Sequence, residues 1–198
     1  MNSKRNNPGE LLAKEIRQCT LCTDELPQPP FPILQLDSRA GILLAGQAPG
    51  RITREKGIPF DDASGKRLRD WLGVDGSTFY DPAVFAIAPM GFCFPGTGKS
   101  GDLPPIPRCA DSWRERLMDS LPNLHTTVVI GRYAIDWHLP HLRSSSITEA
   151  AAHTREGKDE EIFVVPHPSP RNNRWLKQNP WFEIEVLPRL RARIARHL

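Results

Sequence analysis

The sequence lacks any apolar run that approaches the roughly 20 residues of a membrane-spanning helix. Its first residues, Met1 to Gly9, are polar and contain no apolar core, so we expect no secretion signal and a cytoplasmic protein. Strong charge is missing as well. The formal net charge of +3 permits contact with an anionic polymer but does not require it. Composition therefore argues against a membrane protein and leaves a nucleic-acid partner open.

Internal repeats and composition breaks that would mark a domain boundary are also absent. The 198 residues fit one domain, residues 1–198, which is large enough to bury a core without disulfides and which we expect to be a monomer. The chain has only four cysteines, and disulfides are disfavoured where no secretion signal is present.

The chain does contain short apolar runs that alternate with amphipathic segments. This alternation indicates an α/β fold with a mainly parallel sheet between helical layers. The expected strands cover residues 42–45, 84–88, 126–130 and 162–165. The expected helices cover residues 8–18, 64–73 with Ser64 as the cap, a segment from Asp111 or Ser112 to Leu121, 131–138 and 181–196.

Two of the expected strands end in stiff loops. The run Ile42–Ala45 breaks into Gly46-Gln47-Ala48-Pro49-Gly50, and the run 162–165 breaks into Pro166-His167-Pro168-Ser169-Pro170. Ligands of parallel sheets bind beyond the carboxyl ends of the strands. The first loop alone is more typical of an ordinary connection between a strand and a helix, but together the two loops predict the walls of one cleft.

The four cysteines form a Cys19-x2-Cys22 pair and a Cys93-x15-Cys109 pair. A Cys-x-x-Cys turn presents two thiolates to one metal centre, and the second pair flanks a passage rich in proline and glycine with no periodicity. Loops of that length are usually functional or held by something else. The spacing favours a metal, leaves iron–sulfur and zinc equal, and leaves unrelated buried thiols as the alternative.

With these residues laid out, the chain resembles the uracil-DNA glycosylase superfamily, most closely its iron–sulfur, family 4-like branch, over roughly residues 11–190. The cysteine pattern is similar to that branch's [4Fe–4S] ligand set, residues 46–50 to its first motif, and residues 167–170 to its second. The segment Gly57-Ile58-Pro59-Phe60 is similar to the one that supplies a stacking phenylalanine. The resemblance implies a three-layer α/β/α sandwich around a four-stranded parallel sheet.

The resemblance also implies a DNA glycosylase that hydrolyses the bond between uracil, or a related damaged base, and its sugar. Such enzymes take the base out of the helix to reach it. Phe60 would stack on the extruded base, although a core phenylalanine is a serious alternative, because residues 58–60 could simply pack in the interior. His167 would donate a hydrogen bond to the departing base. Residues that would contact the DNA are Ser169, Arg171, Asn172 and Arg174.

The first motif departs from the family pattern. The family usually carries a carboxylate where this chain has Gln47 and Ala48. Gln47 can orient a water molecule but cannot accept its proton, and Ala48 would touch the base. Asp61 is our candidate for the missing acid because it follows Phe60. The alternative is that Asp61 and Asp62 are merely acids at the start of a helix.

A second departure lies after the second strand. The family usually has an asparagine that reads the uracil edge, and this chain has Pro89 there. Backbone groups of Ala88 or Met90, or Gln47, would then have to read the base. The departures keep open a weak or inactive iron–sulfur protein that only binds DNA. A third alternative is a zinc-stabilised α/β hydrolase that acts on a small nucleoside.

Overall fold

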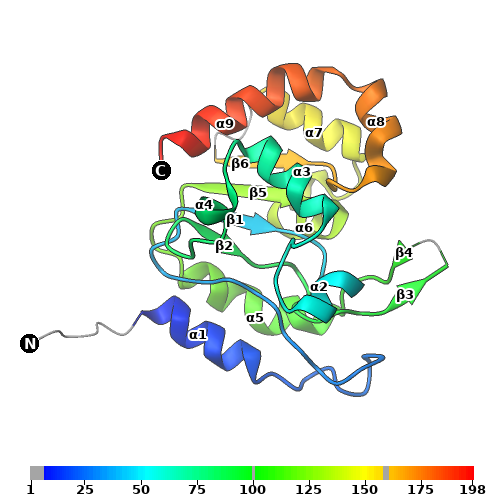
Figure 1. Ribbon diagram of the computed structural model, residues 1–198. Helices are drawn as coiled ribbons and strands as arrows, with labels where there is room; N and C mark the ends of the chain where they lie inside the picture. The colour runs from blue at the N-terminus through cyan, green and yellow to red at the C-terminus, as the bar shows by residue number, and fades with distance from the viewer. Residues whose placement is uncertain (1–6, 100, 158–160) are drawn as a thin grey trace, which may run out of the picture.

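A parallel four-stranded sheet forms the centre of the computed structural model, which describes residues 7–99, 101–157 and 161–198. Its strand order is β2-β1-β5-β6, and every pairing is parallel (Figure 1). The strands are β1 (Ile42–Ala45), β2 (Phe85–Ile87), β5 (Thr126–Ile130) and β6 (Ile162–Val165). Almost every strand residue is buried, as continuous apolar runs covered on both faces should be.

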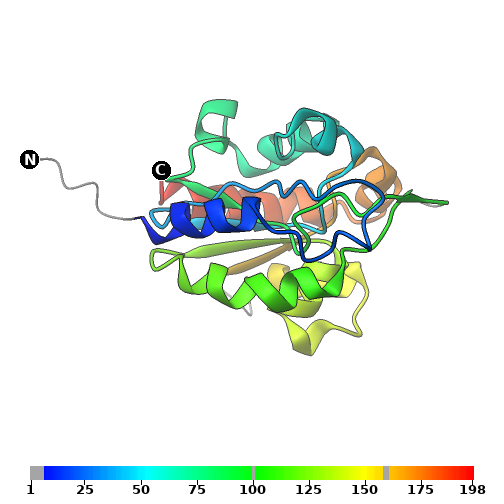
Figure 2. The same ribbon diagram turned by 90° about the horizontal axis from the view of Figure 1, so that it is seen from below.

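Helices cover both faces of the sheet, as Figure 2 shows from below. One face packs against α1 (Pro8–Arg17), α5 (Pro107–Asp119), α6 (Arg132–His138) and α7 (Ile147–Arg155). The other packs against α3 (Ala63–Leu72), α4 (Gly76–Phe79), the π-helical turn η3 (Phe182–Val186) and α9 (Leu187–Ala195). The predicted three-layer α/β/α fold is thereby confirmed.

Two predicted helix starts are wrong. Asp62, not Ser64, caps α3: its Oδ1 accepts a hydrogen bond from the Gly65 amide at 2.8 Å. Helix α5 begins at Pro107, before the expected Asp111 or Ser112, so Cys109 lies in its first turn. A proline preorganises the first turn of a helix, so Pro107 belongs to α5 and not to the loop that precedes the expected start.

Other elements escaped the sequence analysis because they are short. These are α2 (Arg51–Lys56), α8 (Asn173–Gln178) and the α4 turn. The polar residues 144–160, whose pattern favours neither a helix nor a strand, contain α7, which begins with a capping box between Ser146 and Glu149. Residues 158–160 lie outside the described residues.

The long passage after β2 contains a small antiparallel hairpin. Its strands, β3 (Thr97–Gly98) and β4 (Gly101–Asp102), pair Thr97 with Asp102 at the base. The hairpin projects from the body of the molecule (Figure 1). Over the described ranges, no helix has both the length and the apolar character that crossing a membrane requires.

Candidate functional site

A cavity of about 500 Å³ opens beyond the carboxyl ends of β1 and β6, and we call it the sheet-edge pocket. The two loops that the sequence singled out form facing parts of its wall, as predicted. Its lining includes Gly46, Gln47, Ala48, Pro49, Gly50, Phe60, Asp62, Pro89, Asp102, His167, Ser169, Arg171 and Asn172.

Backbone bonds fix the loop that follows β1. The Met90 amide donates to the Gly46 carbonyl at 2.9 Å, and the Gly91 amide donates to the Gln47 carbonyl at 3.0 Å. The Gln47 side chain reaches the other way, and its Nε2 donates to the Leu103 carbonyl at 2.9 Å. The loop is therefore held both to the end of β2 and to the segment after the hairpin.

Phe60 is held in a strained backbone conformation at the pocket wall. Its φ of +55° lies in the left-handed region, which costs a non-glycine residue about 1–2 kcal/mol. Arg69 Nη1 donates to its carbonyl at 3.2 Å, and a Cβ on Gly65 would overlap that same carbonyl. The ring lines the pocket and also packs edge-on against Phe79 at a centroid distance of 6.3 Å. Phe60 therefore lines the pocket, as a stacking residue would, and also packs against the core.

His167 has a defined hydrogen-bonding state. The Ser169 amide donates to its Nδ1 at 3.2 Å, so in the neutral ring Nε2 carries the proton. Asn172 Nδ2 donates to the His167 carbonyl at 2.7 Å, and Arg67 Nη1 on α3 donates to the Ser169 carbonyl at 3.1 Å. Desolvation lowers the pKa of His167, which outweighs the opposite effect of Asp62 and Asp102. The ring is therefore a neutral donor near neutral pH.

The residues expected to contact DNA separate into two groups. Ser169, Arg171 and Asn172 line the sheet-edge pocket, and the Arg171 guanidinium lies against Gly101 of the hairpin. Arg174 is exposed on α8 and does not line the pocket.

The two acids considered for the missing carboxylate also differ. Asp61 does not line the pocket, and its Oδ2 pairs with Lys56 Nζ at 2.9 Å on the surface. Asp62 does line it, but one of its oxygens caps α3.

The base-reading groups expected after β2 are already hydrogen-bonded. The Ala88 amide donates to the Leu44 carbonyl at 3.0 Å, and the Met90 amide is bonded to the Gly46 carbonyl. The Ala88 carbonyl accepts from Arg114 Nη1 at 2.7 Å. Ala88 and Met90 are buried outside the lining, and Pro89 faces the pocket between them.

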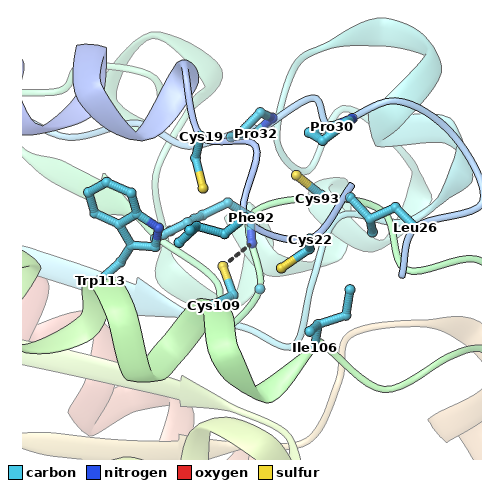
Figure 3. Close-up of a pocket in the computed structure, with 12 residues that line it drawn as sticks. Cys19, Cys22, Leu26, Pro30, Pro32, Phe92, Cys93, Ile106, Cys109 and Trp113 are labelled. Atoms are coloured by element: carbon cyan, nitrogen blue, oxygen red, sulfur yellow. Dashed lines mark hydrogen bonds between the residues drawn. The ribbon is translucent and has the colours of Figure 1, made fainter. Parts of the chain in front are cut away.

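The four cysteines converge on a second, apolar pocket (Figure 3). Cys19 and Cys22 follow α1, Cys93 follows β2 and Cys109 begins α5, and their sulfur atoms point into one shared space. We call this space the cysteine pocket. Its other lining residues include Leu26, Pro30, Pro32, Phe92, Ile106 and Trp113.

Two N–H groups of the cysteine pocket lie close to its sulfur atoms. The Phe92 amide donates to Cys109 Sγ at 3.4 Å. Trp113 is only 7% exposed, and among the described residues its indole Nε1 has no hydrogen-bond partner. In Figure 3 this nitrogen is on the edge of the ring that faces the cysteines. Burial raises the pKa of the thiols of Cys93 and Cys109 to about 11 and about 12.

These features fit a sulfur-ligated group, because buried N–H donors commonly accompany such centres and tune them. Across residues 7–99, 101–157 and 161–198, no set of three or more His, Cys, Asp or Glu side chains has the geometry to hold a metal ion. The metal at this pocket therefore stays a prediction.

Sequence reasoning missed three polar residues of the sheet-edge pocket. Thr53 and Ser64 are each 8% exposed and present hydroxyls on its wall, and Asp102 enters from the base of the hairpin. The run from Gly98 to Gly101 was a hairpin signal, but a pair of two-residue strands has no periodicity to detect.

Fold and site together define an α/β protein whose ligand pocket opens at the carboxyl ends of parallel strands. The model of the uracil DNA glycosylase superfamily matches residues 34–191, so the chain belongs to that superfamily. It is also similar to the Type-4 uracil-DNA glycosylase of Archaeoglobus fulgidus. The two are 25% identical over 164 residues, which cover 80% of this chain and 80% of that relative.

Proposed function

We propose that this protein is a monofunctional DNA glycosylase that excises uracil or a related deaminated base by hydrolysis, as in base excision repair. One observation carries the proposal. Phe60 and His167 come from distant parts of the chain, yet both line a single pocket of about 500 Å³. That volume is typical of a small-molecule site and accommodates one extruded nucleotide.

The pocket supplies the two interactions that a leaving base needs. The Phe60 ring provides an apolar face, and base–aromatic stacking contributes about 1–3 kcal/mol per base. Breaking the glycosidic bond leaves negative charge on the base. The Nε2–H of a neutral His167 stabilises that charge where it develops, and the bond from the Ser169 amide to Nδ1 keeps this donor in place.

Damaged DNA is the proposed partner. Arg171 is at the mouth of the pocket, where a guanidinium contacts phosphate and fills the space that an extruded base leaves. Ser169 and Asn172 organise the same loop, and Arg174 on α8 extends its positive charge.

We further propose that Cys19, Cys22, Cys93 and Cys109 hold a [4Fe–4S] cluster. Their sulfurs share one apolar pocket that is also lined by Trp113, whose indole N–H has no hydrogen-bond partner within the described part of the chain. When bound, the cluster would join the segment after α1 to α5 and take no part in base cleavage. A structural zinc ion held by the same cysteines is the alternative outcome of metal analysis.

The test is incubation of the purified protein with single-stranded and duplex oligonucleotides that contain uracil, hypoxanthine or xanthine, scored for abasic sites. Cleavage of at least one of these substrates supports the proposal, and the His167→Ala variant should lose it. A parent protein that cleaves none of them, yet binds the damaged DNA, would instead support a DNA-binding protein of the same fold. The engagement of Gln47 with Leu103 favours that second candidate, because it occupies an amide proton of Gln47.

A further inference from the structure

The sheet-edge pocket needs an acid that the first motif does not provide. Gln47 stands where the family resemblance places a carboxylate, and an amide cannot accept a proton from water. Asp61 is bound to Lys56 outside the pocket, and Asp62 uses an oxygen to cap α3. A carboxylate that lines the pocket without capping a helix must therefore come from another segment.

Asp102 meets this requirement by position. It is the last residue of β4, at the base of the hairpin, and it lines the pocket. A Cβ placed on Gly50 would stand 3.1 Å from Asp102 Oδ2, so the carboxylate lies directly over the first-motif loop. Gly50 leaves that space open because it has no side chain.

The carboxylate of Asp102 can accept further hydrogen bonds. Among the residues that the structure describes, its hydrogen bond is a long one, from Thr97 Oγ1 to Oδ1 at 3.5 Å. This leaves Oδ2 available to a water molecule or to the sugar. Asp102 and His167 both line the sheet-edge pocket, which places the acid and the base-binding histidine around the same space.

The hairpin is fastened on both sides of the pocket. Immediately after Asp102, the Leu103 carbonyl accepts the bond from Gln47 Nε2 at 2.9 Å. Immediately before it, Gly101 lies against the Arg171 guanidinium. Asp102 is thus held between the two motif loops although it belongs to neither.

We propose that Asp102 is the catalytic acid–base residue of this pocket and replaces the carboxylate missing from the first motif. This inference rests on the proposed glycosylase function. The role is to orient the attacking water, accept its proton and stabilise the positive sugar. The long passage between Pro89 and Arg108 then has a catalytic purpose beyond carrying Cys93.

The chemical step balances with water as co-reactant. The bond between C1′ and the base nitrogen breaks, and its electron pair leaves with the base, whose oxyanion accepts a hydrogen bond from His167 Nε2. The water oxygen bonds to C1′, and its proton passes to Asp102. Solvent then protonates the base anion and removes the proton from Asp102, which leaves a free base, an abasic sugar and the original enzyme.

The first arm of the test measures single-turnover cleavage by the metal-loaded protein. Asp102→Asn should slow cleavage by roughly two orders of magnitude or more, the usual effect of a positioned acid or base. Asp70→Asn makes the same chemical change at an exposed position of α3 outside the pocket, and it should cleave at the parent rate. If the parent protein cleaves and Asp102→Asn cleaves as fast, the inference is overturned while the proposed function stands.

The second arm measures binding and does not need cleavage. DNA with a cationic pyrrolidine in place of the damaged nucleotide imitates the positive sugar, and a neutral tetrahydrofuran site serves as its control. The parent and Asp70→Asn should prefer the cationic site by about tenfold, as one charge-assisted hydrogen bond predicts, and Asp102→Asn should lose this preference. A parent without the preference, or an Asp102→Asn variant that keeps it, overturns the role of Asp102 even if no base is cleaved.

Discussion

The cysteine pocket and the sheet-edge pocket are linked by one segment, residues 89–93, but are made in different ways. Successive backbone amides of that segment donate hydrogen bonds first to the sheet-edge pocket and then to the cysteine pocket. Those of Met90 and Gly91 donate to the first-motif loop, and that of Phe92 donates to Cys109 Sγ. The cysteine pocket is defined by four side chains of one kind in apolar surroundings. The sheet-edge pocket depends on backbone geometry that brings unlike side chains together.

This difference sets what each pocket tolerates. A pocket made by its side chains should fail when one of them is replaced, and it should be indifferent to its other neighbours. A pocket made by backbone geometry should also fail at positions that never touch a ligand. The following predictions test that distinction, from the largest effect to the smallest.

Replacing one cysteine should give the largest effect. Cys109→Ser should abolish stable metal binding, because a four-thiolate centre loses a ligand that water cannot replace well. Iron and sulfide analysis of protein purified without oxygen should find about four irons per parent chain and close to none in the variant. Leu21→Ser, between the two ligands of the first pair, should keep its iron. Stoichiometric zinc in the iron-supplied parent would show that the centre is a zinc site.

Removing the histidine should affect chemistry more than binding. His167→Ala should slow single-turnover cleavage by about 10²–10³-fold, the typical loss for an oxyanion donor. Affinity for uracil-containing DNA should change little, because the charge that His167 stabilises develops in the transition state. His141→Ala, on the η1 turn (Pro140–Leu142), is the control. A loss of affinity as large as the loss of rate would contradict the assigned role.

A single methyl group added at Gly65 should displace Phe60 and so disturb the sheet-edge pocket. Gly65→Ala should lower the free energy of unfolding by about 1–3 kcal/mol or more, because its Cβ overlaps the Phe60 carbonyl oxygen. It should also slow cleavage, since Phe60 must move. In Gly76→Ala the new Cβ has no atom within 4 Å, so this variant should be neutral or up to about 1 kcal/mol more stable. Equal stability of the two variants in denaturant titrations would refute the strained-backbone account.

The effect that is smallest near neutral pH concerns helix α5, which carries Cys109. Arg114 on α5 is buried, bonds the Ala88 carbonyl, and contacts His138 Nε2 at 2.6 Å through its Nη2. Desolvation, and then the Arg114 charge, lower the pKa of His138 from 6.5 to about 3.

Below about pH 6.5 the unfolded chain therefore takes up a proton at His138 that the folded chain does not. His138 should reduce the free energy of unfolding by about 1.4 kcal/mol per pH unit from there down toward pH 3. The His138→Gln variant keeps an acceptor for Arg114 and should show a shallower loss in denaturant titrations at several acidic pH values. Parallel curves for parent and variant would disprove the assignment.

The fold was predictable because its strands are continuous apolar runs. Residues 42–45, 126–130 and 162–165 are strands with the expected bounds, and the fold class follows from their alternation with helices. Helix starts at Asp62 and Pro107 were misplaced, because several neighbouring residues could serve as caps and only tertiary packing selects one.

Site residues could be predicted only where residue type and spacing single out a side chain. His167, between two prolines, and the four cysteines could be singled out from residue type and spacing. The left-handed backbone at Phe60 could not, since nothing in a phenylalanine predicts a positive φ. Asp102 was hidden for a different reason. Its closeness to Gly50 results from a hairpin that crosses between loops far apart in the sequence.

The order of the strands along the chain also decides when during synthesis the sheet-edge pocket can form. The strand that precedes His167, β6, is the last of the four sheet strands to be made and pairs with β5 at the edge of the sheet. A nascent chain that ends after β5 already contains Phe60 and Arg67, but it lacks the Ser169 carbonyl that Arg67 binds. Ribosomes that stop early would therefore release chains with the beginnings of a core but without His167, on which the proposed base cleavage depends.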